Sequence, residues 1–189
     1  YLKAPGITKP GSTSDTPASG IDWYPTLLEL AGVPMPKGQD VDGVSLVPLL
    51  GGESMAERSL FWHYPHYGNQ GGEPSSIVTM GDWKLIHYHE DGRDELYHLG
   101  QDVGEQNDLA AKQPERAFAM RMTLDTWLKS SGAKMPVPDT QFDSAARSSR
   151  WERLLGPGMQ RLEKLHKGYL DKGWSPNKKW WGSSINIVQ

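Results

Sequence analysis

The dipeptide Asp91-Gly92 lies between two β-rich runs and restricts the fold of this chain more than any other feature. An Asp-Gly pair suits the left-handed backbone of a tight hairpin turn, so residues 84–89 and 94–99 are expected to pair as antiparallel strands. Two further runs, at 60–64 and 76–80, are rich in the aromatic and β-branched residues that favour strands. The sequence therefore predicts an antiparallel meander of three or four strands.

A long amphipathic helix is predicted after this meander. Apolar side chains recur three or four residues apart from Ala117 to Leu128, Pro114 suits a first helical turn, and Gly132 suits a terminator. One such helix packed on one antiparallel sheet makes an α+β unit.

Two shorter helices are predicted outside this unit. Residues 22–32 have an apolar face, and Asp22 can cap the start of that helix. A second apolar pattern covers residues 159–169 and is opened by Pro157. The sequence has no internal repeat and no low-complexity tract.

Charge is distributed unevenly along the 189 residues. Residues 1–143 carry 11 Lys and Arg against 20 Asp and Glu, a balance of −9, whereas residues 144–189 carry 9 against 3, a balance of +6. The basic end also holds four of the eight Trp residues, so it suits an anionic partner. A blander interpretation is that this tail packs on the acidic body through its Trp residues.

Composition excludes several classes of protein. The absence of Cys rules out disulfides, thiolate metal sites and a cysteine nucleophile. No run approaches the roughly 20 apolar residues of a membrane-spanning helix. An acidic body without a recognition motif argues against nucleic-acid binding.

The aromatic segment around His63 and His66 is the first candidate site. It places two imidazoles beside the phenols of Tyr64 and Tyr67 and runs into flexible glycines, which suits hydrogen bonding to sugar hydroxyls or to an anion. The alternatives are a half-buried strand with satisfied His side chains and, since two His alone are insufficient, a less favoured metal site.

Two other segments contain residue types that metal sites use. His87 and His89 would share a face of a strand, and His98 could lie near them across the hairpin. A solvated hairpin explains these residues more simply. Asp40, Asp42 and Gly43 resemble part of a calcium loop, but the other oxygen ligands of that loop do not follow. No metal ligand and no catalytic residue is therefore assigned to this sequence.

Six segments, in this order and spacing, resemble the C-terminal third of type I, formylglycine-dependent sulfatases of the alkaline-phosphatase superfamily. They are PGITKPGS at 5–12, IDWYPTLLELAGVP at 21–34, DGVSLVPLL at 42–50, LFWHYPHY at 60–67, GDWKLI at 81–86 and ELYHL at 95–99. The likeness covers about residues 1–143.

The resemblance implies a domain organisation. Residues 1–55 would be the C-terminal edge of an alkaline-phosphatase-like α/β domain, and residues 56–143 the smaller subdomain in which an antiparallel sheet packs on a long helix. Residues 144–189 would form a basic, Trp-rich tail. We expect the chain to be a fragment, with the N-terminal catalytic domain as its partner.

In such sulfatases the hydrate of a formylglycine, made from the Cys or Ser of a Cys/Ser-x-Pro-x-Arg signature, attacks sulfur beside a calcium ion. The nearest string here, residues 112–116, has Lys112 in place of the nucleophile. The nucleophile and the calcium ligands are therefore expected upstream of Tyr1, no cofactor is expected on these residues, and the chain alone is expected to be inactive.

What the resemblance carries over is recognition of a sulfate ester, plausibly on a sulfated polysaccharide. His66 is the first candidate for substrate contact, His63 the second, and Tyr67 belongs to the same loop. A periplasmic or extracellular location is implied only by the resemblance. Two alternatives stay open: a phosphodiesterase or phosphonate hydrolase of the same superfamily, and a non-catalytic carbohydrate-binding or interaction module.

Overall fold

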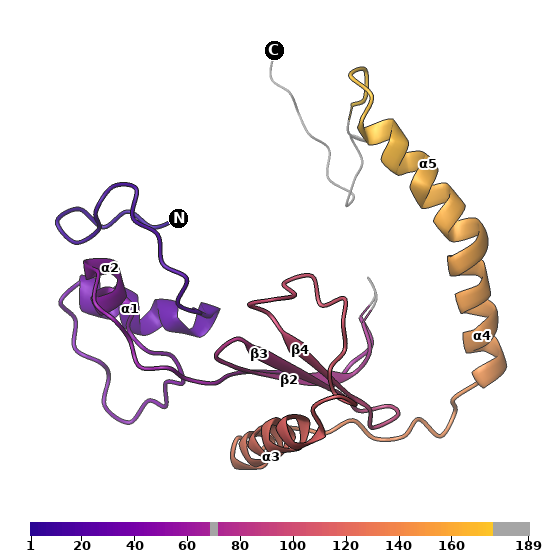
Figure 1. The fold of residues 1–189 in the computed structure, drawn as a ribbon, viewed down its shortest axis with the longest axis horizontal. Coiled ribbons are helices and arrows are strands. Elements are labelled where there is room, and N and C mark those ends of the chain that lie inside the picture. Colours follow the sequence, from indigo (N-terminus) through magenta and orange to yellow (C-terminus); the bar gives the residue numbers. More distant parts are fainter. Residues whose placement is uncertain (69–71, 176–189) are drawn as a thin grey trace. The chain divides into compact units, whose positions relative to one another are not determined.

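The protein is described by a computed structural model covering residues 1–68 and 72–175 (Figure 1). The chain forms two compact units, Tyr1–Pro136 and Val137–Gln189. The last part of the predicted basic tail, with Trp180 and Trp181, lies outside the described residues.

The first unit begins with short helices. A 3₁₀ turn, η1 (Gly20–Asp22), leads into α1 (Trp23–Leu30), and α2 (Val47–Gly51) follows after a loop. The carboxylate of Asp22, expected to cap α1, caps no N–H of that helix. It instead accepts hydrogen bonds from the backbone N–H groups of Ser19 and Val44 and pairs with Arg58. Asp22 therefore ties three segments of the chain together.

The predicted antiparallel meander is present as one four-stranded sheet in the order β1-β2-β3-β4. Its strands are β1 (Leu60–Tyr64), β2 (Ser75–Met80), β3 (Trp83–Tyr88) and β4 (Asp94–His98). Gly92 has a φ of 75° in the turn between β3 and β4, a left-handed conformation that favours glycine. The prediction of an antiparallel sheet from the Asp-Gly turn is confirmed.

The long helix α3 (Pro114–Ser130) covers one face of this sheet, which we call the covered face (Figure 1). Pro114 occupies its first turn as expected. The core between helix and sheet consists of buried apolar side chains: Val78, Leu85, Leu96, Ala117, Met120, Leu124 and Leu128. Sheet and helix thus make the predicted α+β unit.

The register of the last hairpin corrects one expectation. His87 pairs with Asp94, and His98 pairs with Trp83 at the other end of the two strands. His98 therefore packs against the Trp83 ring, with 4.5 Å between ring centroids, and lies away from His87. The expectation that His98 could lie near His87 and His89 is wrong, because the hairpin loop at residues 89–92 sets His87 opposite Asp94 and thereby fixes which residues face each other.

Over its described residues, 137–175, the second unit contains one helical segment built from three pieces. These are α4 (Ser144–Arg153), a π-helical turn η2 (Leu154–Gly158) and α5 (Met159–Tyr169). The Asp143 carboxylate caps α4 by accepting from the N–H groups of Ala145 and Ala146, 2.9 Å away in each case. Pro157 lies inside the π turn, where the wider turn accommodates a residue that has no N–H. In the described part of the chain, no helix combines the length and the apolar character needed to cross a bilayer.

Candidate substrate-recognition site

The loop between β1 and β2, residues 65–74, holds two of the three predicted contact residues, and we call it the β1 loop. It leaves an edge strand of a well-packed sheet, because β1 pairs only with β2 among the residues that the structure describes. The N–H of Gly68 donates to the carbonyl of Gly72 at 3.3 Å, which brings the two sides of the loop together. A loop anchored this way can present side chains from a rigid support.

His66 and Tyr67 lie on the outside of this loop. His66 is exposed, and its ring meets the Tyr64 ring edge-on with 5.4 Å between centroids. Tyr67 is 59% exposed, and its hydroxyl donates to a carboxylate oxygen of Glu90 at 2.8 Å. Both side chains thus offer hydrogen-bonding groups at the surface.

His63 is placed differently from His66. It lies on the covered face of β1, opposite Ser76 of β2. Its Nδ1 is 2.7 Å from the Ser76 hydroxyl and its Nε2 is 2.9 Å from the backbone carbonyl of Lys134. Both ring nitrogens are therefore engaged within the protein, and the structure does not bring His63 and His66 into one surface site.

His63 belongs to a group of three imidazoles, His63, His87 and His89, around Ser76, which we call the imidazole cluster. The His89 ring meets the His87 and His63 rings edge-on, with 4.9 and 5.6 Å between centroids. Ser76 is fully buried, and its hydroxyl is 2.8 Å from Nε2 of His89. Sequence spacing pointed to His87 and His89 but not to His63, which comes from the far end of the meander.

The hydrogen-bond directions in the cluster follow from the Lys134 carbonyl. A carbonyl only accepts, so His63 carries its proton on Nε2, and its Nδ1 accepts from the Ser76 hydroxyl. The Ser76 oxygen in turn accepts from Nε2–H of His89. This chain of bonds uses both ring nitrogens of His63 and the hydroxyl of Ser76, which suits a structural role beneath α3.

Charged groups of α3 and β4 close the cluster on its other side. Nδ1 of His87 lies 2.7 Å from the Asp94 carboxylate, and the Arg121 guanidinium contacts both His87 and Asp94. Arg121 also pairs with Asp125 at 2.8 Å. The pKa of His89 is lowered to about 4, first by burial and then by the neighbouring His87, His63 and Arg121, which Asp125 only partly offsets.

This low pKa predicts a loss of stability in acid. The unfolded chain binds a proton at His89 near pH 6.5, whereas the folded chain does so only near pH 4, so the unfolded state gains protons first. The contribution of His89 to the free energy of unfolding is then fully present above about pH 6.5 and decreases toward pH 4.

We expect His89→Gln to flatten the pH dependence of the free energy of unfolding by about 1–2 kcal/mol over that window. Urea denaturation at pH 7 and pH 4.5 measures this. His166→Gln, at an exposed position of α5, should keep the wild-type slope, and an unchanged slope in the His89 variant would contradict the assignment.

The described residues do not supply a metal site. Across residues 1–68 and 72–175, no three His, Asp or Glu side chains are grouped so that they could hold a metal ion. Asp40 and Asp42, which resembled part of a calcium loop, are both exposed. The described residues therefore do not fit calcium.

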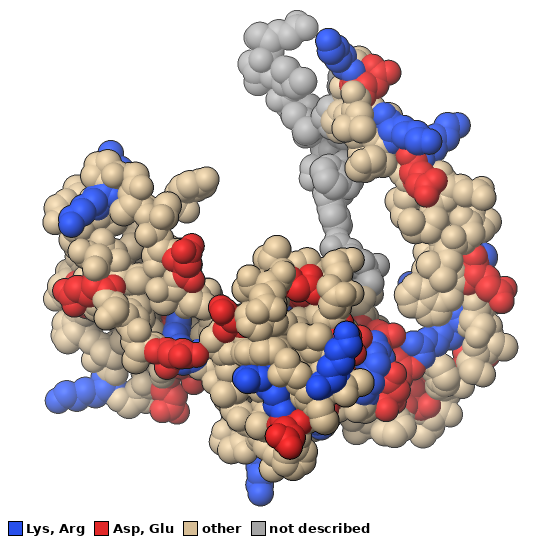
Figure 2. Space-filling model, in the orientation of Figure 1, with Lys and Arg blue, Asp and Glu red and all other residues tan. Residues whose placement is uncertain are grey.

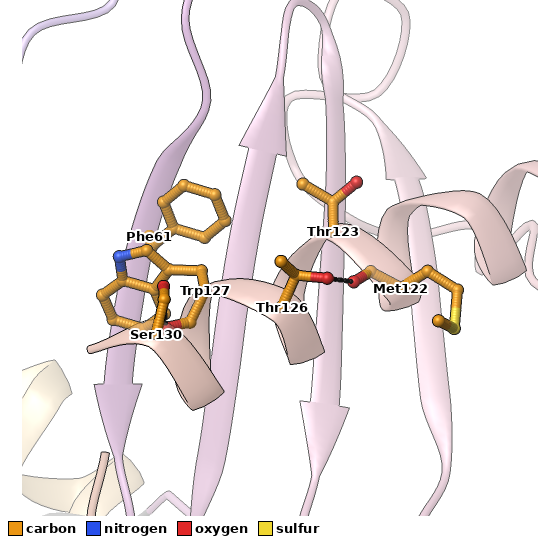
Figure 3. A pocket seen from close by; sticks show the side chains of 6 residues that line it. All are labelled: Phe61, Met122, Thr123, Thr126, Trp127 and Ser130. Carbon is orange, nitrogen blue, oxygen red and sulfur yellow. Dashed lines mark hydrogen bonds between the residues drawn. The ribbon is translucent and has the colours of Figure 1, made fainter. Parts of the chain in front are cut away.

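A surface groove of about 460 Å³ lies between β1 and α3 (Figure 3). The rings of Phe61 and Trp127 stack within it, with 4.9 Å between centroids and 5° between planes. Its other lining residues are Met122, Thr123, Thr126 and Ser130. The Thr126 hydroxyl donates to the carbonyl of Met122, and all six lining residues are uncharged, so this groove is a poor match for an anionic group.

Comparison with known proteins defines the class. A family model described as N-sulphoglucosamine sulphohydrolase, C-terminal, matches residues 1–131. The chain belongs to this sulfatase family, and it corresponds to the family's C-terminal domain.

Individual relatives agree with this family. A sulfatase of Formosa agariphila is 36% identical over 148 residues, covering 70% of this chain and 27% of the relative. An N-acetylglucosamine-6-O-sulfatase of Bacteroides thetaiotaomicron is 31% identical over 117 residues, covering 59% of this chain and 21% of the relative. The chain thus spans about a quarter of the length of these curated relatives.

A solved structure agrees as well. It shows a protein in complex with its substrate D-glucosamine-2-N,6-O-disulfate, and that protein is 28% identical to this chain. The alignment covers 70% of this chain and 28% of the solved chain, with a TM-score of 0.59. The resemblance to sulfatases noted in the sequence is confirmed.

Proposed function

We propose that this chain is the C-terminal region of a sulfatase that hydrolyses sulfate esters on a sulfated polysaccharide, and that the β1 loop contacts the sugar. The observation that carries the recognition role is the exposure of His66 and Tyr67 on a loop anchored to the edge of a rigid sheet. The nucleophile and the calcium ion would come from a part of the enzyme outside these residues. A chain without them should be inactive by itself.

The chemistry of the β1 loop suits a sulfated sugar. An imidazole donates from a ring nitrogen, and in its protonated form it also attracts a sulfate. The Tyr67 hydroxyl donates its hydrogen to Glu90, so its oxygen can accept from a sugar hydroxyl or an N–H group. In this proposal His66 donates to a sulfate or another oxygen of the sugar, and Tyr67 accepts from a neighbouring hydroxyl or N–H group of the sugar.

Two relatives have names that refer to amino-sugar sulfates. One relative is named an N-acetylglucosamine-6-O-sulfatase, and the solved relative holds a disulfated glucosamine as its substrate. These names motivate the choice of substrate for a test. They describe the relatives, and the sugar used by this protein is part of the proposal.

The test compares two substrates in the complete enzyme. His66→Ala should lower kcat/KM on a sulfated glucosamine oligosaccharide by about 10- to 100-fold, the cost of a lost hydrogen bond to a charged group, and by much less on a small aryl sulfate. His166→Ala, the same substitution on α5, should leave both values unchanged. Equal losses on both substrates would remove the recognition role. Turnover of an aryl sulfate by the 189-residue chain alone, with calcium present, would overturn the location of the nucleophile.

A further inference from the structure

The helical segment of the second unit, residues 144–169, has two chemically different sides. Large apolar side chains recur three or four residues apart along one side, and all are at least 41% exposed. They are Trp151, Leu155, Met159, Leu162, Leu165 and Tyr169. This regular spacing defines an apolar stripe along the helix.

Basic side chains follow a second regular pattern. Three arginines occupy positions 147, 150 and 153, and three cations, Arg161, Lys164 and Lys167, occupy the same spacing in α5. Within the same helical segment the acidic residues are Glu152 and Glu163. Figure 2 shows Lys and Arg side chains spaced along α4 and α5, with Asp and Glu side chains between some of them.

Two of the three cations of α5, Lys164 and Lys167, lie on a different side of the helix from the apolar stripe, whereas Arg161 is about 40° from Leu165 and borders the stripe. At about 100° per residue, Lys164 is about 160° around the axis from Leu162 and Lys167 is about 160° from Tyr169. Arg161, Lys164 and Lys167 are all exposed. A ligand can therefore contact Lys164 and Lys167 without contacting the apolar stripe.

We propose that the cations of α4 and α5 bind sulfated polysaccharide, as a contact separate from the β1 loop. The inference rests on the proposed function, because it takes its ligand class from the substrate. The six cations extend over about 30 Å of helix at a rise of 1.5 Å per residue. A polyanion with repeated sulfates can meet several of them together, whereas an isolated sulfate meets one.

The physical consequence is a higher local substrate concentration. A helix that holds one stretch of a long polysaccharide makes capture of a neighbouring sulfate ester an intramolecular event. Binding through exposed ion pairs is weak per contact and is screened by salt, so it allows the enzyme to move along the polymer. Such a surface matters for a long substrate and not for a small aryl sulfate.

The probe for this surface is heparin, measured with the 189-residue chain by affinity electrophoresis and by titration at 50 and 300 mM NaCl. Replacing Arg161, Lys164 and Lys167 together by Gln should weaken heparin binding at least about tenfold at 50 mM NaCl and reduce its salt dependence. Gln is a good helix former, so exposed substitutions of this kind should leave the helix intact. A matched triple variant at Lys3, Lys9 and Lys37, exposed in the first unit, removes the same charge and should stay within about twofold of wild type.

An apolar variant separates a polysaccharide from a membrane. Leu162→Gln with Leu165→Gln should leave heparin binding unchanged, because neither substitution removes a cation. Vesicles of phosphatidylglycerol and phosphatidylcholine serve as the second probe. Vesicle binding that exceeds heparin binding and disappears in the apolar variant would overturn the proposal in favour of a lipid surface. Equal weakening by the two basic triple variants would overturn it in favour of net charge alone. Failure of the proposed function would appear instead as absent sulfatase turnover in the complete enzyme, which heparin binding does not measure.

Discussion

Replacing Asp22 with alanine is expected to lower the free energy of unfolding by about 3 kcal/mol, because it removes the buried partner of a part-buried ion pair. Asp22 is 0% exposed. Its carboxylate accepts from the N–H of Ser19 at 2.7 Å and from the N–H of Val44 at 3.0 Å, and it pairs with Arg58. Alanine would leave two N–H groups and one guanidinium without their acceptor in a buried place.

The ionised state of Asp22 supports the same expectation. Burial raises the pKa of this carboxyl, but the Arg58 hydrogen bond, the two N–H groups and the Arg58 charge outweigh burial, so the pKa lies below its ordinary value. The folded structure thus prefers the charged form. The stabilisation is present at neutral pH and is lost as the pH falls through the folded pKa.

Urea denaturation followed by tryptophan fluorescence measures the Asp22 effect, since Trp23 is the next residue. The matched control is Asp42→Ala, which removes an exposed carboxylate and should change stability by less than about 0.5 kcal/mol. Asp22→Asn keeps the shape of the side chain and one acceptor oxygen. Its loss of stability should therefore lie between the losses of Asp22→Ala and Asp42→Ala. A loss below about 1 kcal/mol for Asp22→Ala would show that the three segments do not depend on this carboxylate.

The sheet and its helix were predictable because local signals determine them. A tight turn at Asp91-Gly92 and short apolar runs restrict neighbouring strands to a meander. Apolar spacing in residues 117–128 then identifies the side of the helix that packs on the sheet. The position of the turn and the spacing of the apolar residues are therefore enough to predict how neighbouring segments pair.

Contacts between distant segments were not predictable in the same way. Asp22 and Arg58 are 36 positions apart, and no periodicity links them. The neighbouring residues predicted that Asp22 caps a helix. In the structure its carboxylate instead binds groups from other segments of the chain. Helix α4 was also missed, although Asp143 before a run of small residues is a recognisable capping signal.

The candidate site was predictable in part. The segment 60–67 identified His63 and His66 together, but strand alternation sends His63 to the covered face, and His66 lies beyond the end of the strand. Alternation from Phe61 could have separated them, because Phe61 and His63 share a face. The roles of His66, His63 and Tyr67 in substrate contact stay predictions that the His66 experiment addresses first.

Leu124→Ala is the second substitution with a large expected effect, about 3 kcal/mol of lost stability. Leu124 is 0% exposed and lies in the buried core formed by the sheet and α3, with Val78, Leu85 and Leu96 from three strands. Truncation removes buried apolar surface and leaves a cavity that a helix held against a four-stranded sheet can only partly close.

Phe118→Ala on the same helix separates core packing from helix propensity. Phe118 is 68% exposed and loses a larger side chain, yet its removal should cost less than about 1 kcal/mol, since alanine also favours the helix. Urea denaturation of both variants and of wild type, at pH 7 where His89 is neutral, makes the comparison. If both substitutions cost the same, the sheet and α3 would not share a packed core. A large loss confined to Leu124→Ala would mean that the helix holds the sheet in register, and with it the edge strand that carries the β1 loop.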